Sequence, residues 1–235
     1  MRTPWIRIAV ASTIGLIWFA GVSAEEPAPS RAGAEVVRDA LDKDPAAPWE
    51  WVRPEAAGVR VAEGGLELRA LPGTLWGKPN NARNQLVRPS PLPAGEPLTV
   101  EVTLTFAPET QAEQAGLMLY FDDGNYVKVV REGLEGKRFL VMAVEKNDEG
   151  KAVAKVVEPS DTVTIRMTCR DRQVVAESRA AQDGEWKELG RCESPADPGG
   201  GGMKLAISAY GGPEGQGRWA RFSGFVVSRA GASGQ

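Results

Sequence analysis

The chain of 235 residues contains no histidine. This absence excludes Ser–His and Cys–His catalysis, imidazole metal ligands and the usual general base near neutral pH. Carboxylate chemistry such as glycoside hydrolysis stays open, because it requires only two suitably spaced Asp or Glu side chains. The oxygen-rich turn at Asp122, Asp123 and Asn125 fits no complete calcium-binding loop. We therefore expect neither a metal nor a cofactor.

Cysteine is nearly absent as well, with Cys169 and Cys192 as the only pair. An even pair in an exported protein favours a disulfide. The surrounding pattern nevertheless predicts three successive strands, Asp161–Arg170, Arg172–Arg179 and Glu185–Cys192, with one cysteine on each side of the middle strand. Strands two apart are separated by ~9–10 Å, beyond the ~4.4–6.8 Å between Cα atoms that a disulfide tolerates. Only a bend in the third strand would join them, so both states remain open.

The sequence also lacks a run of basic residues, and its formal net charge is −3. Binding to nucleic acid depends on neutralising phosphates with Lys and Arg. We therefore expect no nucleic-acid partner.

Long apolar runs are missing except near the start. There Arg2 and Arg7 precede an apolar segment from Ile8 to Ala20, and the small residues Val22-Ser23-Ala24 follow. The apolar segment is shorter than the ~20 residues of a membrane-spanning helix, so residues 1–24 are predicted to be a signal peptide. We expect a secreted or periplasmic protein with no membrane association after cleavage. Its charge becomes −5, because the removed segment contains two Arg and no acid.

The remaining chain divides by composition. Residues 25–48 are rich in Ala, Pro, Glu and Asp and read as a leader, with a possible short helix over Ala34–Lys43. From residue 49 to 228, short β-rich segments alternate with Gly, Pro, Asn and Asp, and Leu98–Phe106 alternates cleanly between apolar and polar side chains. This pattern predicts an antiparallel all-β sandwich. Residues 229–235 are expected to be a flexible tail.

The stretch Gln114–Gly133 predicts the central hairpin of the sandwich. Two β-rich runs flank Asp123-Gly124, a dipeptide preferred by two-residue turns with positive φ at both positions. A turn there makes residues whose numbers sum to 247 face each other. One side then carries Leu117, Leu119, Phe121, Tyr126, Lys128 and Val130, and the other carries Gly116, Met118, Tyr120, Val127, Val129 and Arg131.

Four segments in order resemble a known family: WEWVRPEAAGVRVAEGGLELRALPG from Trp49, QAGLMLYFDDGNYVKVV from Gln114, DTVTIRMTCRDRQVVAESRAAQDGEWKELG from Asp161 and ARFSGFVV from Ala220. They resemble the concanavalin A-like domains at the C-terminus of β-xylosidases and in bacterial relatives of the yeast regulation-of-enolase protein. The resemblance covers Trp49–Val227 and implies a two-sheet jelly roll with one concave face. In β-xylosidases this domain accompanies a catalytic propeller, which has no counterpart here, so the resemblance implies an accessory or ligand-binding role.

No pair of acids favours catalysis. Glu101 has Thr99 and Thr103 where a sandwich glucanase would place alternating acids, and Glu145–Glu149 reads as a hairpin loop. We therefore expect a non-catalytic, carbohydrate-binding module rather than an enzyme. Two alternatives remain: a cell-surface protein-interaction or structural module, and a glycosidase with an unrecognised carboxylate pair. The oligomeric state is left open.

Candidate ligand residues are aromatic rings, which can stack on the apolar faces of sugars, and amides, which both donate and accept hydrogen bonds. Trp76 lies in the loop-like stretch PGTLWGKPNNARNQ, whereas Trp49 and Trp51 are expected to seal the core. Asn also closes turns and Tyr also packs in cores, so each candidate has a purely structural alternative. The predicted ligand-binding residues are Trp76, Asn80, Asn81, Asn84, Gln114, Tyr120, Tyr126, Lys128, Arg131, Tyr210 and Trp219.

Overall fold

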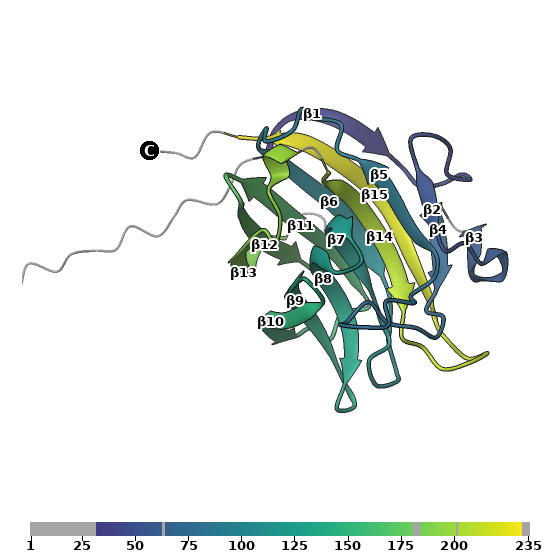
Figure 1. Ribbon diagram of the computed structural model, residues 1–235. Helices are drawn as coiled ribbons and strands as arrows, with labels where there is room; N and C mark the ends of the chain where they lie inside the picture. The colour runs from purple at the N-terminus through teal and green to yellow at the C-terminus, as the bar shows by residue number, and fades with distance from the viewer. Residues whose placement is uncertain (1–31, 63, 181–183, 201, 232–235) are drawn as a thin grey trace, which may run out of the picture.

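The computed structural model describes residues 32–62, 64–180, 184–200 and 202–231, and within them the protein is a sandwich of two antiparallel sheets (Figure 1). This confirms the predicted all-β class and two-sheet architecture. The predicted signal peptide, the turn residue Asp183 and most of the predicted tail lie outside the described residues. No helix in the described part is long and apolar enough to cross a membrane.

One sheet has eight strands, in the order β13-β12-β11-β6-β15-β4-β3, with β1 also paired to β15. Strands β6 and β11 form its centre, where apolar residues face inward and Thr, Glu and Arg face outward, as the alternation in Leu98–Phe106 predicts. The members of this sheet are β13 (Lys187–Glu193), β12 (Gln173–Arg179), β11 (Thr162–Arg170), β6 (Leu98–Thr105), β15 (Trp219–Ala230), β4 (Gly65–Arg69), β3 (Val59–Ala62) and β1 (Ala32–Asp39).

The other sheet has seven strands, in the order β10-β9-β8-β7-β14-β5-β2. Two short 3-10 turns, Ala56–Gly58 and Pro198–Gly200, lie outside both sheets. The members of this sheet are β10 (Glu149–Val157), β9 (Lys137–Lys146), β8 (Asn125–Leu134), β7 (Gln114–Asp122), β14 (Lys204–Tyr210), β5 (Gln85–Pro89) and β2 (Glu50–Val52).

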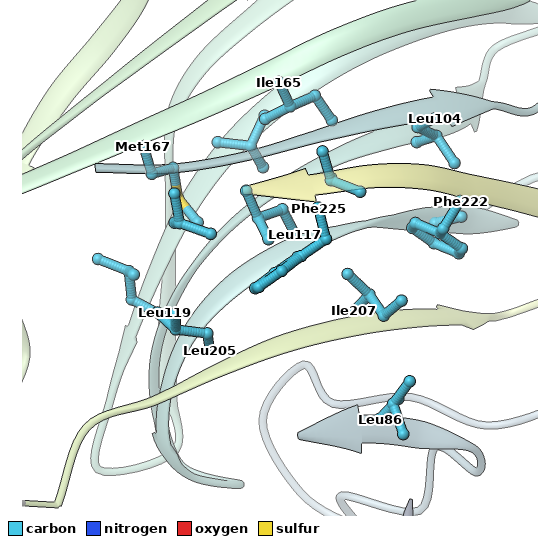
Figure 2. Packing of buried hydrophobic residues seen from close by; sticks show 14 of the residues in the cluster. Leu86, Leu104, Leu117, Leu119, Ile165, Met167, Leu205, Ile207, Phe222 and Phe225 are labelled. Atoms are coloured by element: carbon cyan, nitrogen blue, oxygen red, sulfur yellow. The ribbon is translucent and has the colours of Figure 1, made fainter. Parts of the chain in front are cut away.

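The core lies between the sheets, and Figure 2 shows side chains from both sheets meeting there. Trp49 is buried in it, with its ring edge-on to Phe225 at 5.0 Å, and Trp51 packs against it, as expected. The labelled core residues are Leu86, Leu104, Leu117, Leu119, Ile165, Met167, Leu205, Ile207, Phe222 and Phe225.

The predicted short helix over Ala34–Lys43 is wrong, because strand β1 occupies this region and pairs with β15. Val37 lies opposite Val227 and packs against the core, and Leu41 is buried there too. Pairing along an existing strand satisfies the backbone groups of β1, and this tertiary gain outweighs the weak helical periodicity of the segment.

The central hairpin turns at Asp123-Gly124, but its predicted register is wrong by one residue. The register shifts between Tyr120 and Asp122, so Leu119 faces Val127 and Leu117 faces Val129. These four side chains are buried in the core, whereas Tyr120, Tyr126 and Lys128 share the outer face. Neither turn residue has positive φ; instead, Asp122 Oδ1 accepts a hydrogen bond from Gly124 N at 2.9 Å.

Both cysteines are free. The register explains this state, because Val174 of β12 lies opposite Cys169 on one side and Cys192 on the other. The intervening strand keeps the two thiols too far apart for a bond. Burial raises the pKa of each thiol to about 11.

Candidate functional site

The strongest cluster of polar and aromatic side chains in the described chain lies on the outer face of the seven-stranded sheet. The loop of residues 70–84 between β4 and β5 folds over this face, with Leu75 and Ala82 packed on it. Strand parity brings the sheet residues together, because every second side chain of a strand faces the same way. We call the following set the Trp76 face: Trp76, Asn80, Gln114, Tyr120, Tyr126, Lys128, Glu145 and Tyr210.

Trp76 is the exposed element of the Trp76 face, with 43% of its surface accessible, whereas the tyrosines beneath the loop are buried. Its ring lies above Gly150 of β10, because a Cβ built there would approach ring atoms Cε2 and Cζ2 to 2.7 Å. Glycine at this position thus leaves the space that the indole occupies. The result is an exposed aromatic ring on a rigid support.

Lys128 is buried beneath this ring, and its Nζ is 5.3 Å from the ring centre, within cation–π range. Nζ donates to Gln114 Oε1 at 2.8 Å and to Tyr210 Oη at 3.1 Å. Burial lowers the pKa of Lys128 to about 8, although Glu132 and Glu145 partly oppose this shift. The buried amine therefore holds the side chains of Gln114 and Tyr210 in place.

Tyr126 and Glu145 lie side by side on β8 and β9 and hold the loop. The Tyr126 hydroxyl is 2.7 Å from Glu145 Oε2 and 3.0 Å from the Leu75 carbonyl oxygen. Glu145 Oε1 accepts a hydrogen bond from Gly77 N at 2.7 Å. Both backbone neighbours of Trp76 are thus tied to the sheet.

The hairpin end of the Trp76 face is held by ion pairs and hydrogen bonds. The Tyr120 hydroxyl donates to Asp123 Oδ1 at 2.8 Å, and Arg53 pairs with both carboxylate oxygens of Asp123. Burial alone would raise the pKa of Asp123, but the hydrogen bonds from Arg53 and Tyr120 outweigh it and lower that pKa. Asn80 donates to Asp148 Oδ1 at 2.8 Å and so fixes the far end of the loop.

Four predicted site residues lie elsewhere. Asn81 accepts from Thr74 N within the loop, and Asn84 is fully buried, bonded to the backbone of Glu55. Arg131 lies on the core side of β8, because its partners Ala115 and Leu140 are core residues, and the one-residue register shift explains this correction. Trp219 is on the outer face of the eight-stranded sheet, stacked on Arg60 at 4.1 Å.

That second outer face is rich in paired charges. Arg166 and Glu177 are buried there and form two hydrogen bonds, and Trp186 covers Arg166 at 4.0 Å. Glu101 lies opposite Arg166, and burial raises its pKa. Arg166 and Glu177 thus satisfy each other on this face, and they lie away from Trp219, which is at the other end of β15 from the strand position opposite Glu101.

Sequence reasoning missed Glu145 and Gly150. It assigned Glu145 to a hairpin loop, whereas β9 continues to Lys146 and the turn is Asn147-Asp148, both with positive φ. The dipeptide Asn-Asp was an available signal, because these residues tolerate that conformation best after glycine. Nothing in the sequence marks Gly150 as the support of Trp76.

The fold agrees with a known family over most of its length. The model of the β-xylosidase C-terminal concanavalin A-like domain, GH43_C2, matches residues 43–228. The chain belongs to this family. A comparison with curated proteins finds no match.

Solved structures share the fold of this GH43_C2 domain at low identity. The GH43 BlXynB protein of Bacillus licheniformis is 20% identical with a TM-score of 0.70, and the match covers 82% of this chain and 39% of that one. The GH43B protein of the Bacteroides ovatus xyloglucan PUL is 21% identical with a TM-score of 0.70, over 92% and 41% of the chains. The present chain thus spans about two fifths of each of these proteins.

A functionally unknown protein of Saccharomyces cerevisiae is 18% identical to this GH43_C2 domain, with a TM-score of 0.62. That match covers 78% of this chain and 97% of the yeast chain. The same sandwich therefore also forms nearly the whole of a solved chain.

Proposed function

We propose that this GH43_C2 domain is a non-catalytic module that binds glycan on the Trp76 face. One observation carries the proposal: Trp76 presents an exposed ring above buried tyrosines and amides gathered from several strands. An indole offers an apolar, electron-rich surface to the C–H face of a sugar. Its membership of a family named for β-xylosidases is consistent with such a ligand.

The charge arrangement favours a neutral glycan over an acidic one. Lys128, the buried cation of this face, already donates to Gln114 and Tyr210. Burial raises the pKa values of Glu132 and Glu145, as expected where ionised groups are poorly solvated. An acidic sugar would bring a further negative charge close to Glu132, Glu145 and Asp148, and Lys78, the exposed cation of the loop, is already 3.6 Å from Asp148. Stacking on the exposed Trp76 ring is the available contact.

Glu132 and Glu145 do not suit glycoside hydrolysis as a pair. Glu132 lies opposite Phe139 and Glu145 lies opposite Tyr126, so the strand rise of ~3.3 Å per residue separates them by about 20 Å. Glycosidases place their two carboxyl groups ~5–9.5 Å apart across an accessible bond. Glu145 is also fully buried, with both oxygens engaged. These facts argue against Glu132 and Glu145 as a catalytic pair.

A matched pair of tryptophan variants tests the proposal. Neutral and acidic polysaccharides are screened by glycan array and affinity electrophoresis, and the affinity of any hit is measured by calorimetry. We expect Trp76→Ala to weaken binding about threefold to tenfold, the range of one aromatic contact. Trp219→Ala, which removes a partly buried tryptophan from the other sheet, should leave affinity unchanged.

Two results would reject the proposal. Equal losses in both variants would mean that the Trp76 face is not the binding surface. No binding by the unaltered protein across plant, algal and bacterial polysaccharides would leave the protein-interaction module as the better account. Release of sugar from a bound polysaccharide would instead establish the glycosidase alternative.

A further inference from the structure

Trp76 owes its position to contacts made by its two neighbours in the chain. The Leu75 carbonyl oxygen is 3.0 Å from the Tyr126 hydroxyl, and Gly77 N donates to Glu145 Oε1 at 2.7 Å. Tyr126 and Glu145 are in turn 2.7 Å apart through the hydroxyl and Oε2. The two side chains therefore form one closed clamp around Trp76.

The clamp contains one hydrogen too few if Glu145 is ionised. A tyrosine hydroxyl carries a single hydrogen, but the Tyr126 hydroxyl lies within hydrogen-bond distance of two acceptors, Leu75 O and Glu145 Oε2. A proton on Oε2 of Glu145 supplies the missing hydrogen. Glu145 then donates to Tyr126, and Tyr126 donates to Leu75.

The surroundings of Glu145 favour this proton. The side chain is fully buried, and burial is the largest cause that raises its pKa above the usual 4.5. Asp148, in the β9–β10 turn, raises it further, whereas the hydrogen bonds from Tyr126 and Gly77 and the charge of Lys128 lower it. From β14, Tyr210 also lies near enough to interact electrostatically with Glu145. Lys78 Nζ, 3.6 Å from Asp148, adds an exposed positive charge at the loop.

We propose that Glu145 is a positioning residue that carries a proton on Oε2 and, through Tyr126, locks Trp76 in place for the glycan. The effect of this clamp on glycan binding rests on the proposed function, but the protonation of Glu145 does not depend on any ligand. When the pH rises and Glu145 loses the proton to solvent, Tyr126 can serve only one acceptor. Either Leu75 or Glu145 then loses its hydrogen bond, and the loop that carries Trp76 loosens.

The carboxyl proton can be observed without any glycan. Infrared difference spectra of the full chain, recorded from about pH 4.5 to neutral pH, should contain a protonated-carboxyl band that disappears with a midpoint above 4.5. Glu145→Gln should remove the Glu145 component of this band, while Glu101→Gln and Glu132→Gln, at the other glutamates whose pKa burial raises, should retain it. In fluorotryptophan-labelled protein, the ¹⁹F resonance of Trp76, assigned with Trp76→Phe, should shift or broaden with the same midpoint.

The glutamine variant also separates positioning from charge. In Glu145→Gln, the amide oxygen can still accept from Gly77 N and the amide nitrogen can donate to the Tyr126 hydroxyl, so this variant reproduces the protonated clamp. Glycan affinity of the unaltered protein should fall about fivefold as Glu145 ionises, the effect of one lost hydrogen bond. The Glu145→Gln variant should bind glycan tightly both at about pH 4.5 and at neutral pH. The Tyr126→Phe variant should bind glycan weakly at both pH values.

The outcomes distinguish this inference from the proposed function. A missing carboxyl band, with glycan binding through Trp76 that does not vary with pH, overturns the clamp and leaves the function intact. A band and a Trp76 resonance that titrate together and respond to Glu145→Gln support the clamp even if no glycan binds. In that case the proposed function is rejected and the clamp is retained.

Discussion

At the scale of single residues, burial decides the chemistry of the ionisable groups on the Trp76 face. Lys128 keeps its hydrogen bonds to Gln114 and Tyr210, yet water is excluded from its ammonium group, so its pKa falls from 10.5 to about 8. A buried charge that is hydrogen-bonded but lacks a direct ion pair costs free energy. This cost should appear in the pH dependence of stability.

We predict that Lys128 makes the folded state more stable as the pH rises above about 8. The folded protein releases this proton near pH 8, but the unfolded chain holds it until about 10.5, so the unfolded state binds more protons in between. The contribution to the free energy of unfolding rises by at most ~1.4 kcal/mol per pH unit. It is measured by urea unfolding at several pH values.

Lys128→Met provides the comparison for this measurement. Cys169 and Cys192 act in the opposite direction above pH 9, because their pKa values are raised to about 11 in the folded state. Subtracting the curve of the variant cancels their effect, since both proteins keep the cysteines. A difference between the two curves that stays constant from pH 7 to 10 would contradict the prediction.

At the scale of elements, the β7–β8 hairpin determines which side chains reach the Trp76 face. A one-residue shift in register exchanges the two faces of a strand, and the irregularity between Tyr120 and Asp122 produces such a shift. It brings Tyr126 and Lys128 to the side of Tyr120. It also moves Arg131 to the core side.

We predict that Gly124→Val lowers the free energy of unfolding by at least ~1 kcal/mol, because a side chain there overpacks the structure. A Cβ at Gly124 would lie 2.7 Å from Asp148 Oδ1 and 3.2 Å from Asp148 N. The physical cause is thus this contact rather than a positive φ. Thermal and urea unfolding measure the change.

Gly202→Val is the control for this variant, because no heavy atom lies within 4 Å of a Cβ built at Gly202. It adds the same side chain without the clash. Equal stability of the two variants would show that the β7–β8 turn does not pack on the β9–β10 turn as described.

At the scale of the whole molecule, two sheets close one core, and loops on the seven-stranded sheet create the candidate site. Such an arrangement separates stability from binding, since core residues face inward and site residues face outward on the same strands. The paired charges around Arg166 occupy the opposite surface. A glycan on the Trp76 face would therefore leave that surface free.

We propose that the whole protein is exported and that the mature chain begins at Glu25. The expectation follows from Arg2 and Arg7, the apolar segment after them and the small residues before the predicted cleavage point. Mass spectrometry of the N-terminal peptide in extracellular or periplasmic fractions checks it. Protein from those fractions that still begins at Met1 would contradict it, as would its retention in the cytoplasm.

The order of apolar and polar residues along the chain was enough to predict the fold class and most strands. Alternation in segments such as Leu98–Phe106 specifies which residues are buried, because the side-chain period of a strand is fixed at two. The same reasoning placed Trp76 in a loop and kept the cysteines on separate strands. These features depend on local pattern and on neighbouring strands.

The composition of the site and the conformation of the first strand depend on contacts between segments that are distant in the chain. The register irregularity before Asp122, the place of Glu145 beneath Trp76 and the space above Gly150 depend on contacts between residues far apart in the chain. The segment of β1 is helical or extended by propensity alone, and pairing with β15 selects the strand. The free energy that selects these features comes from pairing and packing between distant segments, and no local sequence pattern encodes it.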